Sequence, residues 1–250
     1  MDARLSAAPV LAEFGALVKT WVPLQALYVG GSLAGGDYRP GVSDLDVTAI
    51  VTGQLGGVDR RRLEQRHVQL EERCRSTAAL HCIYVDANRL SDAGAEHPMW
   101  SDRRIRDRPL SALARIELVR LAVTLYGPSP DTFFGEPDAA ALRSAARAEL
   151  TGYWQSAVAK PSLWLSDWCV DLGLVTIARA DAAIHEDCLI TKREAIDRLG
   201  RYGVPEALVH EIRLRRDGKS RDQSLVHRAR RGRIARRLVA RRIAELSELH

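Results

Sequence analysis

The chain has 250 residues, of which 46% are hydrophobic and 28% charged, a composition that is ordinary for a globular protein and long enough for one large domain or two small ones. No apolar run approaches the roughly 18 residues of a membrane span, and the first residues lack the basic segment of a secretory signal, so we expect a cytoplasmic protein without a membrane partner. The net charge of +5 is uneven: residues 210–250 hold 13 Lys and Arg against 5 Asp and Glu, and the rest of the chain holds 24 against 27.

The N-terminal part begins with a predicted helix and two predicted strands. Ala, Leu, Phe and Val recur at helical spacing over residues 6–22, and Pro23 ends the pattern. Two short apolar runs follow at residues 27–29 and 47–51, and their Val, Ile and Tyr content is typical of strands. A glycine-rich connection joins them.

This connection and the second strand carry a constellation of polar residues. Asp44 and Asp46 are one residue apart, so on a strand they point to the same face, where two carboxylates repel each other. A divalent cation removes that repulsion, and magnesium commonly takes one or two carboxylates plus substrate phosphates. Gly30, Gly31 and Ser32 allow a phosphate to approach the backbone closely. The pattern predicts a site for a triphosphate and a metal ion, although a hairpin with a solvated edge remains the alternative.

The order glycine, glycine, serine, spacer and Asp-x-Asp resembles the signature of the nucleotidyltransferase superfamily that includes DNA polymerase beta. The resemblance implies a mixed sheet with flanking helices, a Mg²⁺ site at Asp44 and Asp46, and nucleotide-binding roles for Gly31, Ser32 and Ser43. It also implies transfer of a nucleoside monophosphate, most simply AMP from ATP, to an acceptor.

The next predicted strand lacks the expected third acid. Residues 58–74 are typical of a solvated helix, and residues 79–86 read as a strand. Members of the superfamily carry a carboxylate on the corresponding strand, whereas His81 occupies the approximate place here. His81 is either a catalytic base or a half-buried sheet histidine. Asp86 at the strand end, and then Glu96 in a predicted loop, are the other candidates for the third acid.

A helix is predicted over residues 110–125, ending at Gly127 and Pro128. This junction resembles that of the aminoglycoside adenylyltransferases that modify streptomycin and spectinomycin, in which the chain then enters a helical second domain. We therefore expect an α+β protein with a nucleotidyltransferase domain at 1–135 and an all-helical bundle at 136–250. Helices are predicted over residues 139–159 and 163–181, and another begins near Thr191, with Glu194 as its capping-box partner.

The second domain supplies further candidate residues. In the adenylyltransferases, an arginine near the end of an apolar helix and a lysine at the start of the next are directed at the nucleotide, and the matching positions are Arg179 and Lys192. Surface solvation is the alternative for both. Two tryptophans four residues apart, with nearby acids, suggest an acceptor cleft for a polyol or a cation, or else core tryptophans beside solvated acids; the candidates are Trp164, Asp167, Trp168 and Asp171.

The arginine-rich C-terminus is most simply a helix with a solvated basic face, and nucleic-acid binding is a secondary possibility. The sequence thus predicts a Mg²⁺-dependent nucleotidyltransferase acting on a small-molecule acceptor such as an aminoglycoside. A nucleotide-binding homologue without transfer activity and an RNA-directed or RNA-binding protein stay open as alternatives.

Overall fold

The computed structural model describes residues 3–74, 80–92, 94–219 and 223–247. The chain divides into two compact units, Met1–Pro137 and Asp138–His250. Within the described residues, no helix is both long enough and apolar enough to cross a membrane.

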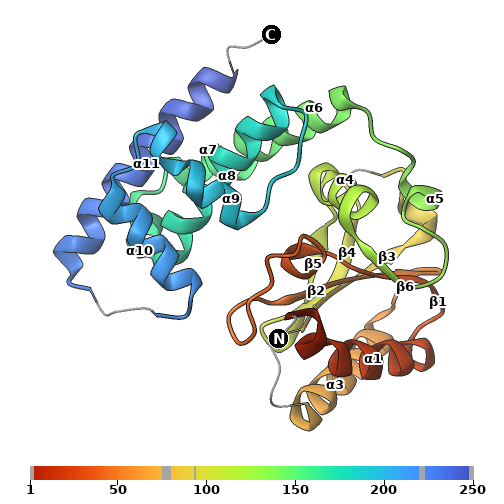
Figure 1. Ribbon diagram of the computed structural model, residues 1–250. Coiled ribbons are helices and arrows are strands. Elements are labelled where there is room, and N and C mark those ends of the chain that lie inside the picture. The colour runs from red at the N-terminus through yellow and green to blue at the C-terminus, as the bar shows by residue number, and fades with distance from the viewer. Residues whose placement is uncertain (1–2, 75–79, 93, 220–222, 248–250) are drawn as a thin grey trace. The chain divides into compact units, whose positions relative to one another are not determined.

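The first unit is a mixed six-stranded sheet with helices on both faces, as Figure 1 shows. The strand order is β5-β4-β3-β2-β1-β6, in which β2 and β3 are parallel and the other neighbouring pairs are antiparallel. Its elements are α1 (Ala3–Trp21), β1 (Leu24–Val29), α2 (Gly31–Ala34), β2 (Leu45–Val51), α3 (Gly57–Arg73), β3 (Leu80–Asp86), the short 3-10 helix η1 (Ala87–Arg89), β4 (Glu96–Ser101), β5 (Arg104–Pro109), α4 (Ala112–Leu121), β6 (Val123–Tyr126) and α5 (Asp131–Phe134).

Side-chain alternation along the central strands separates two apolar layers. Val47 and Ala49 of β2 belong to the layer that α1 and α3 cover, whereas Ile50 belongs to the layer that includes Leu118 of α4. Because successive side chains of a strand point to opposite faces, the even-numbered positions of β2, including Asp46, share the face of Ile50. The predicted mixed sheet with flanking helices is confirmed.

The β4–β5 hairpin differs from the sequence expectation, which placed Glu96 in a loop. The two strands pair from Glu96↔Pro109 to Ser101↔Arg104. Their turn consists of Asp102 and Arg103, whose φ angles are 49° and 58°. Turns with two positive φ angles suit hairpins but usually carry Asn or Gly, so the sequence gives little sign of this one.

The predicted helix over 110–125 ends early, at Leu121, and its last part is instead the edge strand β6. This strand pairs antiparallel with β1, from Val29↔Val123 to Leu27↔Tyr126. The sequence did not indicate strand β6 because a short apolar run fits a helix or a strand equally well. Pairing with β1 makes this segment a strand.

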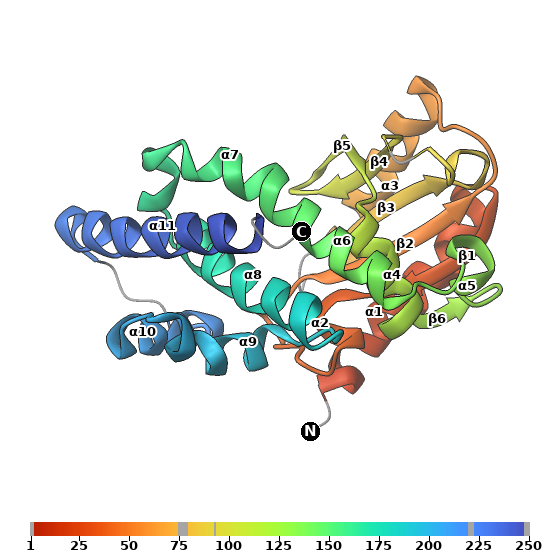
Figure 2. The same cartoon turned by 90° about the horizontal axis from the view of Figure 1, so that it is seen from above.

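The second unit is helical, and in it the C-terminal helix α11 packs against η3 and against α8, which Figure 2 labels together with α11. The expected helix at 139–159 forms with a π-helical segment in its middle, and the expected helix at 163–181 begins with a separate 3-10 turn. The predicted capping box of Thr191 and Glu194 is present. The elements are α6 (Ala139–Glu149), η2 (Leu150–Trp154), α7 (Gln155–Val158), η3 (Pro161–Leu165), α8 (Asp167–His185), α9 (Lys192–Arg198), η4 (Leu199–Tyr202), α10 (Glu206–Arg216) and α11 (Leu225–Ser247).

Candidate active site

The turn after β1 brings its backbone against the start of β2. The amide of Gly30 donates to the carbonyl of Asp46 at 2.9 Å, and Gly31 has a φ of 58°, in the left-handed region that favours glycine. A Cβ on Gly31 would lie 2.0 Å from Asp46 Oδ2. Gly31 is therefore a position at which only glycine lets the backbone approach the Asp46 carboxylate.

Asp44, Asp46 and His81 meet on one face of the sheet. Asp46 and His81 are direct neighbours in the parallel β2–β3 pair. His81 Nδ1 lies 3.8 Å from Asp44 Oδ2 and 3.9 Å from Asp46 Oδ1. The carboxylates are half exposed, at 51% and 49% of their side-chain area, and the imidazole is 20% exposed. Two carboxylates and an imidazole that reaches both are thus open to a ligand from solvent.

The other two candidates for the third acid lie at the opposite end of the strands. Asp86 pairs with Val51, five residues along β2 from Asp46, which is roughly 16 Å at the rise of a strand. Its carboxylate accepts hydrogen bonds from the amides of Gly53 and Asn88. Glu96 begins β4, which runs antiparallel to β3, so it also lies toward the Asp86 end. Of the three candidates, only His81 lies beside the aspartate pair.

The connection between α2 and β2 contains a residue that the sequence interpretation missed. Tyr38 is buried, and its pKa is raised by burial and also by the nearby negative charge of Asp44. A single large aromatic among glycines and polar residues was the available signal. Ser43 is buried too, and its hydroxyl accepts a hydrogen bond from the Arg39 amide at 3.1 Å. Ser43 therefore stabilises the connection immediately before Asp44.

The chemistry of these donors fits a magnesium ion better than a softer metal. Asp44 and Asp46 offer carboxylate oxygens, and their exposure leaves room for the phosphate and water ligands that magnesium usually retains. Among the described residues, no group of three or more His, Cys, Asp and Glu side chains is arranged to hold a metal by itself. Substrate oxygens would have to complete the coordination.

Arg179 and Lys192 belong to the second unit and lie close to one stretch of chain. Arg179, near the end of α8, donates from Nε to the carbonyl of Ile190 at 3.0 Å. Lys192 is the first residue of α9, directly after the Thr191 cap, and is exposed. The structure thus brings the two positions together through the 190–192 segment, and their role toward a nucleotide stays a prediction.

Trp164 is a core residue, contrary to the expected acceptor cleft. It is 1% exposed, and its indole nitrogen donates to the carbonyl of Ala157 at 2.9 Å. Trp164 and Trp168 do not share a helical face, because η3 ends at Leu165 and α8 begins at Asp167. Only Trp168, at 56% exposure, remains available to a ligand.

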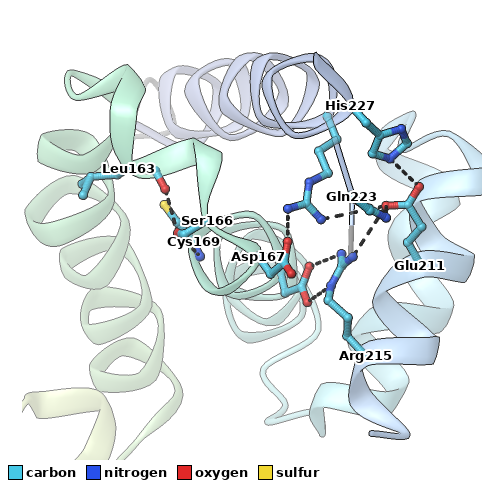
Figure 3. Close-up of polar contacts among 10 residues, drawn as sticks. Leu163, Ser166, Asp167, Cys169, Glu211, Arg215, Gln223 and His227 are labelled. Atoms are coloured by element: carbon cyan, nitrogen blue, oxygen red, sulfur yellow. Dashed lines mark hydrogen bonds and ion pairs between the residues drawn. The ribbon is translucent and has the colours of Figure 1, made fainter. Parts of the chain in front are cut away.

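Each of the two acids near these tryptophans is bound to an arginine. Figure 3 shows Asp167, Glu211 and Arg215 as members of one connected set of polar contacts. Asp167 pairs with the buried Arg231. Asp171 accepts two hydrogen bonds from Arg215, at 2.6 and 2.7 Å. Burial raises the pKa of Asp171, and Arg215 offsets this in part. These acids link α8 to α10 and α11, which removes the reason to assign them to an acceptor.

Comparisons with known proteins bear on the fold. No protein-family model matches the sequence, and no curated protein matches it. The structure is similar to that of the spectinomycin adenyltransferase AAD(9) from Enterococcus faecialis, solved with ATP and spectinomycin, with a TM-score of 0.70 and 11% sequence identity over 95% of this chain and 99% of that chain. A toxin-antitoxin solved with AMP-PNP matches with a TM-score of 0.34 and 18% identity over 58% of this chain and 96% of that chain. The first likeness shows a shared fold.

Proposed function

We propose that the protein is a nucleotidyltransferase that transfers AMP, or another nucleoside monophosphate, from a nucleoside triphosphate to an acceptor hydroxyl. The observation that carries the proposal is the meeting of Asp44, Asp46 and His81 beside the glycine turn at Gly31. The fold shared with an adenyltransferase solved with ATP and spectinomycin supports it, and it favours a small-molecule acceptor.

Each residue has one role in this proposal. Asp44 and Asp46 would hold Mg²⁺, which when bound neutralises charge on the phosphates and on the leaving pyrophosphate. The backbone of Gly31 and the hydroxyl of Ser32 bind the β- and γ-phosphates. Because magnesium prefers oxygen ligands to imidazole nitrogen, His81 is assigned to the proton and not to the metal.

The proposed step is an in-line displacement at the α-phosphorus. The acceptor oxygen forms a bond to the α-phosphorus as its proton moves to the imidazole of His81, and the bond to the oxygen that bridges the α- and β-phosphorus atoms breaks. Pyrophosphate leaves with that bridging oxygen. The products are the acceptor carrying the nucleoside monophosphate, and pyrophosphate.

The test is pyrophosphate release from ATP and Mg²⁺ with a panel of hydroxyl-bearing acceptors, combined with mass spectrometry for a gain of one AMP unit. Asp46→Asn should lower the rate roughly 10²-fold or more, the loss of several kcal/mol of charge stabilisation. The control Asp59→Asn removes one exposed carboxylate from the first turn of α3, and it should retain the rate. Equal rates in both variants would refute the assignment of Asp46.

A second candidate function is nucleotide binding without transfer, and the histidine in place of a third carboxylate is the observation that favours it. His81→Gln distinguishes the two. If His81 is the base, this variant binds ATP as the wild type does and releases pyrophosphate roughly 10²- to 10⁴-fold more slowly. If the protein only binds nucleotide, ATP binding is measurable in wild type and variant, and neither releases pyrophosphate above the rate of the Asp46→Asn variant.

The roles of Arg179 and Lys192 belong to the same proposal. Both would bind the nucleotide by charge, so Lys192→Gln should weaken ATP binding. Arg193→Gln is the matched control, because Arg193 is the next residue of α9 and is also exposed. Equal ATP affinity in the two variants would remove Lys192 from the nucleotide site.

A further inference from the structure

Helix α11 carries a large positive charge that its own sequence does not balance. Its 23 residues include eight arginines and one glutamate. Another charged helix of the protein, α3, contains five arginines and four acidic residues. A helix exposed to solvent does not need eight arginines for solubility, so the excess positive charge of α11 indicates anionic partners within the protein or outside it.

Three arginines of α11 face the bundle and have partners within it. Arg231 pairs with Asp167, and Arg242 pairs with Asp181 and, at 2.8 Å, with Glu245. Arg236 donates to the carbonyl of Val158 at 3.1 Å. These residues hold α11 to the rest of the second unit, and they are not available to another molecule.

Four other arginines form an exposed line, which we call the α11 arginine stripe. Its members follow one another at intervals of three or four residues, so they share one face of the helix. Within the described part of the chain, only Arg241 of these four has an acidic contact, with Glu245 at 3.4 Å; it also donates to the carbonyl of Tyr202 at 3.3 Å, and its side chain stays 62% exposed. Like charges at such spacing destabilise a helix by a few tenths of a kcal/mol per pair, a cost that an external polyanion removes. The stripe consists of Arg230, Arg233, Arg237 and Arg241.

The opposite face of α11 is already covered. Ala235 and Val239 are fully buried, and Ile243 and Leu246 are nearly so. A Cβ on Gly232 would lie 2.1 Å from the carbonyl oxygen of Trp164, which shows how closely η3 approaches the helix. Because a helix that binds a membrane surface must insert its apolar face, this packing argues against a lipid partner.

From this arrangement we infer that the α11 arginine stripe binds single-stranded nucleic acid through its phosphate backbone. The stripe extends over the 11 residue steps from Arg230 to Arg241, about 16 Å of helix, and guanidinium groups bind phosphate oxygens with good geometry. A hollow of about 280 Å³ adjoins it, lined by Arg233 of the stripe and by apolar side chains that include Pro161 and Leu165. An unstacked base can lie against such a hollow while its phosphate contacts the stripe, which favours a single strand over a duplex.

The experiment measures binding of the full chain to fluorescent 20-mer RNA and DNA strands, without ATP or magnesium, between 50 and 200 mM salt. Four phosphate contacts predict a slope of about −3 for log K against log salt concentration. The variant Arg233→Gln/Arg237→Gln should reduce this slope by about 1.4 and weaken binding about 50-fold at 50 mM salt. Arg233→Lys/Arg237→Lys, which keeps both charges, should retain most of the binding.

The control variant is Arg61→Gln/Arg62→Gln, which removes two exposed arginines from α3 and the same net charge. It should bind nucleic acid as the wild type does. Asp46→Asn should also bind nucleic acid as the wild type does, so loss of nucleic-acid binding can be distinguished from loss of nucleotidyl transfer. The inference is overturned if the full chain does not bind the strands, if binding does not depend on salt, or if the α3 and α11 variants lose equal affinity. Tighter binding to a duplex than to a single strand would also overturn it, as would a preference for anionic vesicles or an acidic protein. Thermal unfolding at the wild-type midpoint shows that the glutamine variant is folded.

Discussion

Replacing Gly31 by alanine tests whether the turn after β1 positions the Asp46 carboxylate. The new Cβ would lie 2.0 Å from Asp46 Oδ2 and 2.9 Å from its Cγ, so the carboxylate must move by roughly 1.5 Å to regain a normal contact distance of roughly 3.5 Å. Since misplacement of a reacting group by 1 Å can cost about 10²-fold in rate, we expect a loss of that size in pyrophosphate release. The positive φ of 58° adds backbone strain of about 1–2 kcal/mol.

A second glycine variant separates the effect of backbone strain from the effect of the steric clash with Asp46. Gly53, in the loop after β2, has a φ of 82°, and a Cβ there would meet nothing within 4 Å. Gly53→Ala should therefore lower the unfolding midpoint by a few degrees, as Gly31→Ala should, and leave the transfer rate unchanged. The measurements are thermal unfolding and Mg²⁺-dependent pyrophosphate release on both variants. Equal activity in the two would refute the role given to the turn.

Two further predictions concern stability. Burial lowers the pKa of His67 to about 3, so the folded state holds the neutral ring. The contribution of neutral His67 to the free energy of unfolding is complete above the unfolded-state pKa of about 6.5 and is lost as pH falls toward 3. Between pH 7 and pH 5 the loss is about 2 kcal/mol. Urea unfolding measures the free energy of unfolding at pH 7 and pH 5, and the difference between the two values should be smaller in His67→Gln than in the wild type. An equal difference in the two proteins would contradict the reasoning. Thr191→Ala removes the capping box with Glu194 and should cost about 1 kcal/mol in the same assay, whereas Thr191→Ser should not; equal losses in the two would argue against the cap.

The sequence was sufficient for the fold class and for the centre of the sheet, because those features depend on local patterns. Apolar runs rich in Val, Ile and Tyr predict β2 and β3. The Asp-x-Asp spacing predicts that Asp44 and Asp46 share one face. The choice among His81, Asp86 and Glu96 was not local. It depended on β3 running parallel to β2, which brings His81 next to Asp46 and carries Asp86 to the other end.

The β4–β5 hairpin shows a different limit of prediction. Its edge strand β5 is mostly charged, and Ile105 is its one large apolar side chain. Arg60 of α3 contacts Asp107 at 2.7 Å, and Arg103 contacts Glu71 at 2.9 Å. Charged side chains are common on edge strands because they prevent pairing with other chains. A strand whose stability comes from a helix more than 30 residues earlier leaves little periodic signal in its own sequence.

The acids of the two units are the same residue type in very different surroundings. Asp44 and Asp46 are half exposed beside His81. Asp167 and Asp171 are less exposed, at 35% and 24%, and each is bound to an arginine 64 and 44 residues later in the chain. A buried carboxylate requires such a partner, and a partner so distant in sequence is visible only once α10 and α11 are placed against α8. Since each arginine neutralises the charge that would attract a cationic acceptor, the acceptor of the proposed reaction should be sought by its hydroxyl groups and not by its positive charge.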